Sequence, residues 1–165
     1  MTEKSFNMDC FSHSIYLDCG IEKAYEFIGR TDGFNKWFIG SAEYISGEGI
    51  QRKTGEFIRV NDSYKWKWLA KDFSTSGKIL ESKENSLLKF SFGGLFLVII
   101  TINEDKGRTL LTLKQKYVNG VAHNDFAHIN CCVCWAFFLT NLKSVIEHGT
   151  DLRETETDNE ELVNR

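Results

Sequence analysis

The sequence is 165 residues long, carries a net charge of −3 and is 42% hydrophobic, which fits one globular domain with a core of its own. The slightly acidic charge disfavours nucleic acid as a partner, because phosphate binding needs a basic surface. Five cysteines, an odd number, favour a reduced protein over a disulfide framework, so we expect a cytoplasmic location. Residues 1–11 contain no apolar run typical of a signal peptide, and the apolar stretch 95–102 is too short to span a membrane; we expect no membrane insertion.

Apolar and polar residues alternate over 11–17, which predicts a first strand. A helical pattern follows over 21–28 and ends at Gly29. Thr31 or Asp32 can cap a second short helix, which runs through Phe34 and Phe38 and ends at Gly40.

The middle of the chain has the pattern of short strands joined by turns that contain Gly or Asn. Trp66 and Trp68 alternate with lysines and therefore share one face of their strand. The predicted strands cover residues 42–45, 56–60, 66–70, 77–82, 88–92, 96–102 and 110–117.

A long helix is predicted from about Val121 to Gly149, with Gly149 as its C-terminal cap. One face of it carries residues at helical spacing that are mostly apolar. They are His128, Cys131, Cys132, Trp135, Phe138, Leu139, Leu142, Val145 and Ile146. The opposite face is polar and holds most of Asn130, Thr140, Asn141, Lys143, Ser144 and Glu147.

The order of strand, two short helices, several strands and a long helix segregates helices from strands, which predicts an α+β domain. We expect a curved antiparallel sheet of about six to seven strands around the long C-terminal helix. Residues 10–153 form this domain, residues 1–9 are expected to be flexible, and the acidic residues 154–165 are expected to be a disordered tail.

Three stretches resemble the START-like (SRPBCC) helix-grip superfamily, in particular the group related to the C-terminal domain of the activator of Hsp90 ATPase. They are Ile15–Ile28 with Lys36–Phe38, Ser76–Glu81 with Leu88–Phe92, and Trp135–Lys143 with Glu147–Arg153. The resemblance implies the helix-grip fold, in which related proteins bind apolar ligands beneath the long helix. The sequence has no room for the activator's N-terminal domain, and Cys131, Cys132 and Cys134 are not marks of the group.

The first functional hypothesis is a cavity between sheet and helix that binds a small apolar or amphipathic molecule, without a cofactor. The inward aromatic residues would line this cavity. Gln115, Tyr117 and His128 would line it too, and their polar groups need a partner inside the protein. A solid aromatic core is the alternative, with backbone carbonyls or water as the partners. The candidate residues are Trp37, Trp66, Trp68, Phe90, Phe92, Gln115, Tyr117, His128, Trp135 and Phe138.

Three other hypotheses remain. His128, Cys131 and Cys134 offer metal-binding atoms, but three ligands along one straight helix do not make a structural zinc site, so no metal is expected. His128 with Tyr117 or Glu43 could perform acid–base chemistry in a cyclase-like enzyme, although no catalytic motif selects this. A protein-interaction module would have a filled core and an exposed apolar patch near Trp37 and Phe38; exposed strand edges and Trp37 also leave a homodimer open.

Overall fold

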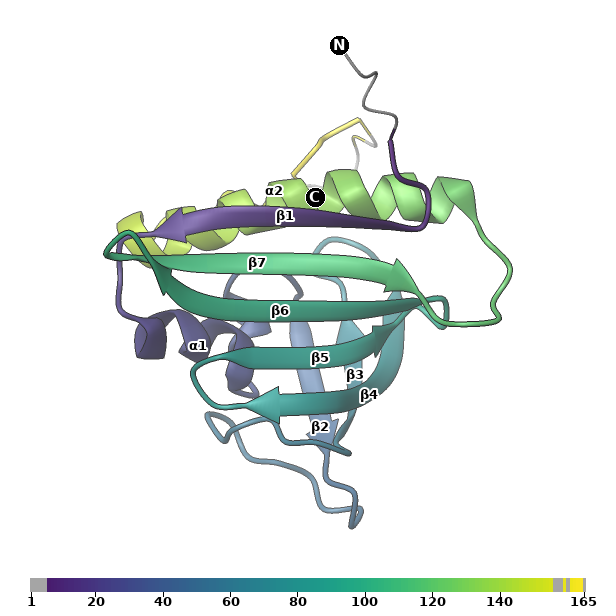
Figure 1. Cartoon of the computed structure of the whole chain (residues 1–165). Coiled ribbons are helices and arrows are strands. Elements are labelled where there is room, and N and C mark those ends of the chain that lie inside the picture. The colour runs from purple at the N-terminus through teal and green to yellow at the C-terminus, as the bar shows by residue number, and fades with distance from the viewer. Residues whose placement is uncertain (1–5, 156–158, 160, 165) are drawn as a thin grey trace.

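The computed structural model describes residues 6–155, 159 and 161–164 (Figure 1). Within them the chain forms one antiparallel sheet of seven strands in the order β1-β7-β6-β5-β4-β3-β2, with a long helix after the last strand. The elements are β1 (Cys10–Leu17), α1 (Ile21–Gly29), the 3₁₀ turn η1 (Phe34–Lys36), β2 (Ser41–Ile45), β3 (Ser63–Lys67), β4 (Ser74–Lys83), β5 (Leu87–Phe92), β6 (Phe96–Asp105), β7 (Arg108–Tyr117) and α2 (Asp125–His148). The predicted α+β helix-grip architecture is therefore confirmed.

The sheet is curved, and α2, α1 and η1 all lie on its concave side (Figure 1). A register shift between Ile79 and Glu81 interrupts the pairing of β4 with β5, and such irregularities increase bending and twist. α2 lies along the edge strand β1, where Lys143 Nζ donates to the Tyr16 carbonyl at 2.7 Å. The helix therefore shields one edge of the sheet from pairing with another strand.

α2 begins at Asp125, a few residues later than predicted, because Asn124 is extended and caps the helix. The Asn124 side chain accepts a hydrogen bond from the Ala127 N–H at 3.0 Å. Gly149 ends the helix with φ of 68°, as the sequence predicted. The prediction that Asn141 belongs to the solvent-facing side is wrong, since this residue is fully buried.

The predicted strand 56–60 is absent from the described structure, and Phe57 makes only an isolated bridge to Arg30. The loop between β2 and β3 is instead organised by buried Asp62, whose carboxylate accepts hydrogen bonds from the Arg52 side chain and from the Arg59 N–H. Since these contacts curl the chain back, β3 starts only at Ser63. It ends at Lys67, before Trp68, so the predicted strand 66–70 is shifted toward the N-terminus.

After α2 the chain is hydrogen-bonded to the segment around η1. Arg153 donates to the Ile39 carbonyl at 2.8 Å and to the Asn35 carbonyl at 3.0 Å. Asn141 donates to the Trp37 carbonyl at 2.8 Å and accepts from the Leu152 N–H at 2.7 Å. We call these hydrogen bonds of Asn141 and Arg153 the clasp. They give the stretch after α2 a structural role. The expectations for residues 1–9 and 154–165 fall partly outside the described residues.

Candidate ligand-binding site

Three of the predicted cavity residues, Trp37, Trp66 and Phe90, fill a solid core. The Trp66 ring lies 5.3 Å from Phe90 and 4.0 Å from Tyr64, measured between centroids. The indole N–H of Trp66 donates to the Tyr44 hydroxyl at 3.0 Å, and that of Trp37 donates to the Phe27 carbonyl at 2.9 Å. Since both indole groups are satisfied by the protein, no ligand is needed to complete this part of the interior.

A crevice of about 130 Å³ remains between α2 and the turn that joins β3 to β4. Its walls are mostly aromatic, and four of the predicted residues contribute to them. It is lined by Phe38, Trp68, Lys71, Phe92, Asn130, Cys131, Cys134, Trp135 and Phe138.

Phe38 lies at the centre of the crevice wall. Its ring stacks on Trp135 with centroids 4.5 Å apart and meets Phe138 edge-on at 4.8 Å and Trp68 at 5.3 Å. The helix side of the crevice is formed partly by Cys131 and Cys134, one turn apart. These side chains are short compared with the rings around them, so space stays open beside the aromatic wall.

The two thiols make this side of the crevice apolar. Burial raises the pKa of Cys131 to about 11, although the Gln115 amide opposes the rise. Burial also raises the pKa of Cys134, against the opposing effect of the Lys71 ammonium group. Both thiols are therefore protonated at neutral pH and behave as small apolar groups with weak hydrogen-bonding capacity.

The polar groups near the crevice are few. Lys71 is the charged residue among those that line it, and Asn130 is the amide. Behind the wall, Gln115 accepts a hydrogen bond from the Trp135 indole at 2.9 Å, while its amide nitrogen has no partner among the described residues. Gln115 is fully buried, and this nitrogen lies close enough to the Cys131 thiol to lower its pKa.

Tyr117 and His128 were predicted to line the same cavity but lie outside the crevice. The Tyr117 hydroxyl donates to the Asn124 carbonyl at 2.8 Å, and its ring stacks on that of His128. His128 is fully buried, with Nε2 3.2 Å from the Asn7 carbonyl and the Phe6 ring 5.7 Å away. Asn7 and Phe6 therefore fill this end of the space between the sheet and α2.

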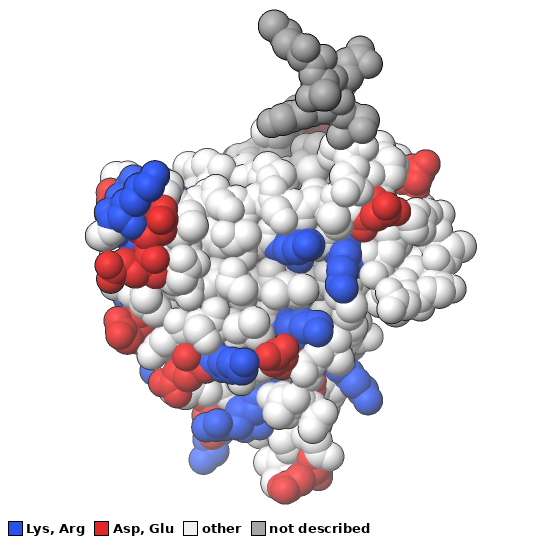
Figure 2. All heavy atoms as spheres, in the orientation of Figure 1, with Lys and Arg blue, Asp and Glu red and all other residues white. Residues whose placement is uncertain are grey.

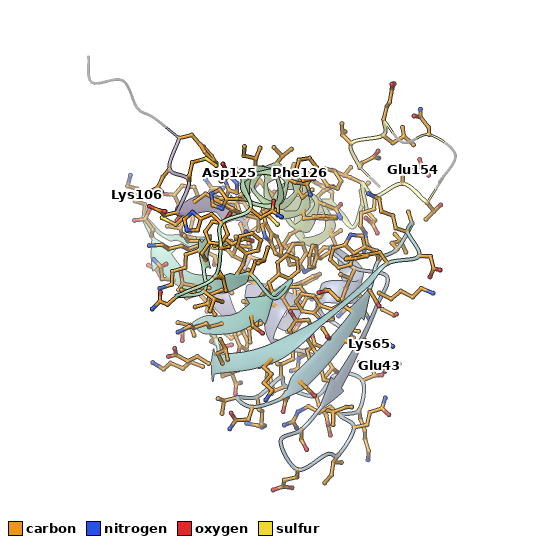
Figure 3. The ribbon with its side chains drawn as sticks, turned by 90° about the vertical axis from the view of Figure 1, so that its right-hand side faces the viewer. Glu43, Lys65, Lys106, Asp125, Phe126 and Glu154 are labelled. Carbon is orange, nitrogen blue, oxygen red and sulfur yellow. The ribbon has the colours of Figure 1, made fainter. Side chains whose placement is uncertain are left out.

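The proposed partnership of His128 with Glu43 is wrong. Glu43 lies opposite Lys65 in the pairing of β2 with β3, at the edge of the sheet farthest from β1. Figure 3 shows both residues well away from the start of α2, which Asp125 and Phe126 mark. Among the described residues, no three His, Cys, Asp or Glu side chains are grouped so that they could hold a metal ion.

The expected apolar patch near Trp37 and Phe38 is also wrong, because both side chains are buried under the clasp after α2 and against the aromatic core. Trp37 therefore cannot pair subunits. Five residues that line the crevice were not predicted from the sequence: Phe38, Lys71, Asn130, Cys131 and Cys134. Two short cysteines one turn apart on an otherwise aromatic helix face were the signal that could have indicated the crevice.

A larger concavity of about 880 Å³ lies under the β2–β3 loop, but it is an open groove on the surface. Arg52, Lys53 and Arg59 alternate there with Glu48 and Glu56, so its rim carries charges of both signs. Water solvates such a groove well, and it lacks the enclosed apolar wall that small-molecule sites share.

No family model matches the sequence, and no curated protein matches it. Among solved structures, SSP2350 from Staphylococcus saprophyticus is similar, with a TM-score of 0.66 and 16% identity over 87% of this chain and 96% of that one. The Aha1 dimer from Colwellia psychrerythraea has a TM-score of 0.65 and 18% identity over 86% of this chain and 98% of that one. DynU16, from the dynemicin biosynthetic locus, has a TM-score of 0.67 and 13% identity over 89% of this chain and 50% of that one. At these identities the likeness shows the fold, and the chain has the helix-grip fold.

Proposed function

We propose that this protein binds a small amphipathic molecule whose apolar part occupies the crevice between α2 and the β3–β4 turn. The observation that carries the proposal is an apolar crevice of about 130 Å³ in an otherwise solid aromatic interior. An apolar cavity of about 150 Å³ accommodates benzene, so this crevice fits a group about the size of one ring.

The polar end of the ligand is best matched by an acid. Lys71 supplies the charge among the lining residues, and a carboxylate beside it would gain a charge-assisted interaction at the mouth of the crevice. The Gln115 amide, which has only the weakly accepting Cys131 thiol beside it, adds a second polar contact for a ligand atom that reaches past Cys131. An aromatic or short branched aliphatic acid combines these features.

The same proposal assigns no acid–base role to His128. This residue and Tyr117 are engaged with Asn7 and Asn124, and neither belongs to the crevice lining. We further propose a cytoplasmic location, because all five cysteines are free. We infer kinship with the Hsp90-activator group within this fold, which the likeness to the Colwellia protein supports.

A fluorescence titration tests the proposal, because Trp68 and Trp135 line the crevice. Phenylacetate, uncharged toluene and the two-ring 1-naphthylacetate serve as probes. We expect phenylacetate to bind with a Kd of about 0.1–1 mM, as is typical for a ligand of this size, and to bind more tightly than toluene. The larger naphthyl ring should bind more weakly than the single ring.

Two variants locate the site. Cys134→Leu should abolish phenylacetate binding by occupying the crevice, and Lys71→Gln should remove the preference for the acid over toluene. Lys78→Gln, a lysine of the open groove, is the matched control and should bind as the wild type does. Unchanged phenylacetate affinity in Cys134→Leu, or no binding of any probe at 10-fold above the expected Kd, would refute the proposal.

A further inference from the structure

The outer face of α2 carries apolar side chains that the rest of the described chain does not cover. Phe126 is 81% exposed, Ile129 48% and Val133 66%, and these residues follow one another at helical spacing. Ala136 is also exposed, and Phe137 is half-buried beside it. We call these five residues the outer stripe. Single exposed apolar residues are ordinary, whereas a contiguous row along one helix is typical of an interaction surface.

The stripe lies on a stretch of helix that contains no charged residue. No Asp, Glu, Lys or Arg occurs from Phe126 to Leu142. In Figure 2 the upper part of the molecule, where α2 and β1 lie in Figure 1, is white between charged side chains at its two ends. By length and composition alone α2 could cross a membrane, yet only 22% of its most apolar window is buried in the fold. Packing in the core therefore accounts for the apolar residues on the inner face of α2 but not for those on its outer face.

We propose that the outer stripe binds the outer stripe of a second copy of this chain, with two α2 helices packed antiparallel across a twofold axis. A neutral apolar face can meet its own copy without bringing like charges together, and twofold pairing is the commonest form of self-association. Antiparallel packing also sets the helix dipoles in opposite directions, which is favourable.

The charges around the stripe argue against two other occupants. The chain's own C-terminal residues carry Glu154 and Glu161, which would lose solvation against an apolar face. A helix that lies on an anionic bilayer has Lys and Arg along its polar side, whereas α2 begins with Asp125 and has its first lysine at Lys143.

The size of the stripe sets the expected strength of the dimer. From Phe126 to Thr140 the helix rises about 21 Å, and the outward half of a cylinder about 10 Å across and of that length has an area on the order of 300 Å². Standard interfaces bury about 800 Å² per partner, so this contact belongs to the weak class, with a Kd in the range of about 10–500 µM. Cys131 and Cys134 line the crevice and do not belong to the outer stripe, so the two surfaces can be tested separately.

Sedimentation velocity over protein concentrations from about 5 µM to about 1 mM, spanning the expected Kd, tests the proposal. The wild type should shift from monomer toward dimer across the series. Val133→Glu, at an exposed helical position, should stay monomeric at every concentration and keep the wild-type circular dichroism spectrum. Val60→Glu changes another exposed valine, in the β2–β3 loop, and is the control that should dimerise like the wild type.

A wild-type protein that remains monomeric to 1 mM would overturn the proposal, as would Val133→Glu dimerising like the wild type. Co-sedimentation of monomeric wild type, but not of Val133→Glu, with vesicles of phosphatidylcholine and phosphatidylserine would assign the stripe to membranes and likewise overturn it. Phenylacetate titration of Val133→Glu separates the two proposals, since the crevice should bind equally well without the dimer.

Discussion

The two sides of Phe38 differ in how the interior is filled. Toward the sheet, Trp66 and Phe90 pack with Phe34 into a solid layer, each ring surrounded by others. Toward α2, Phe38 and Trp68 face Cys131 and Cys134 across the crevice. The same aromatic richness thus produces a core on one side and a candidate binding site on the other. The difference comes from the size of the opposing side chains, because a void opens where short residues face large rings.

Replacing a tryptophan on each side should give the largest contrast. Trp66→Ala should lower the free energy of unfolding by about 3–5 kcal/mol, since it removes a fully buried ring and leaves the Tyr44 hydroxyl without its donor. Trp68→Ala should cost less than about 1.5 kcal/mol, because Trp68 is only half-buried at the crevice wall. Urea denaturation of both variants measures the two losses in the free energy of unfolding. Equal losses would mean that the crevice side is packed as tightly as the core.

The clasp after α2 holds the backbone on either side of Phe38, so removing its hydrogen bonds should disturb the packing on both sides of the Phe38 ring. Asn141→Ala leaves the buried Trp37 carbonyl and the Leu152 N–H without partners and should lower stability by about 1–3 kcal/mol. Thr140→Ala, an exposed neighbour on the same helix, is the control and should change stability by less than about 0.5 kcal/mol. A matching loss in both variants would point to a general effect on the helix instead of the clasp.

The architecture could be predicted from the sequence because strands and the long helix each repeat over short distances. The alternation along 88–92 and the Gly149 cap are local signals, and both are confirmed. The loop at 56–60 was missed because Asp62 organises it through Arg52, a contact that alternation does not reveal. The crevice depends on how Phe38 and Cys134, nearly a hundred positions apart, meet in the fold. Packing volumes of that kind leave no periodic trace in a sequence.

The clasp should also respond to acid. Burial acts to raise the pKa of Asp151, but hydrogen bonds from Arg153 and Asn141 outweigh it and hold that pKa below its usual value. A carboxyl with a lowered folded-state pKa stabilises the protein above its unfolded pKa of about 3.9 and loses this contribution as pH falls. Asp151→Asn should therefore be less stable than the wild type at pH 7, and the difference should shrink toward pH 3. Denaturation curves from pH 7 to pH 3 check this; a constant difference would contradict it.

Filling the crevice should have the smallest effect on stability. It also tests most directly whether the crevice contains free space. Cys134→Leu adds apolar atoms beside Phe38 and Trp68, where space already exists, so the free energy of unfolding should change by less than about 1.5 kcal/mol in either direction. A similar small-to-large exchange in a solid region, Ala24→Leu, should destabilise by about 1–3 kcal/mol, because Ala24 is fully buried among packed side chains. Urea denaturation of the two variants compares the regions directly. If Cys134→Leu were as costly as Ala24→Leu, the crevice would be too small to admit even a leucine side chain and could not hold a ring.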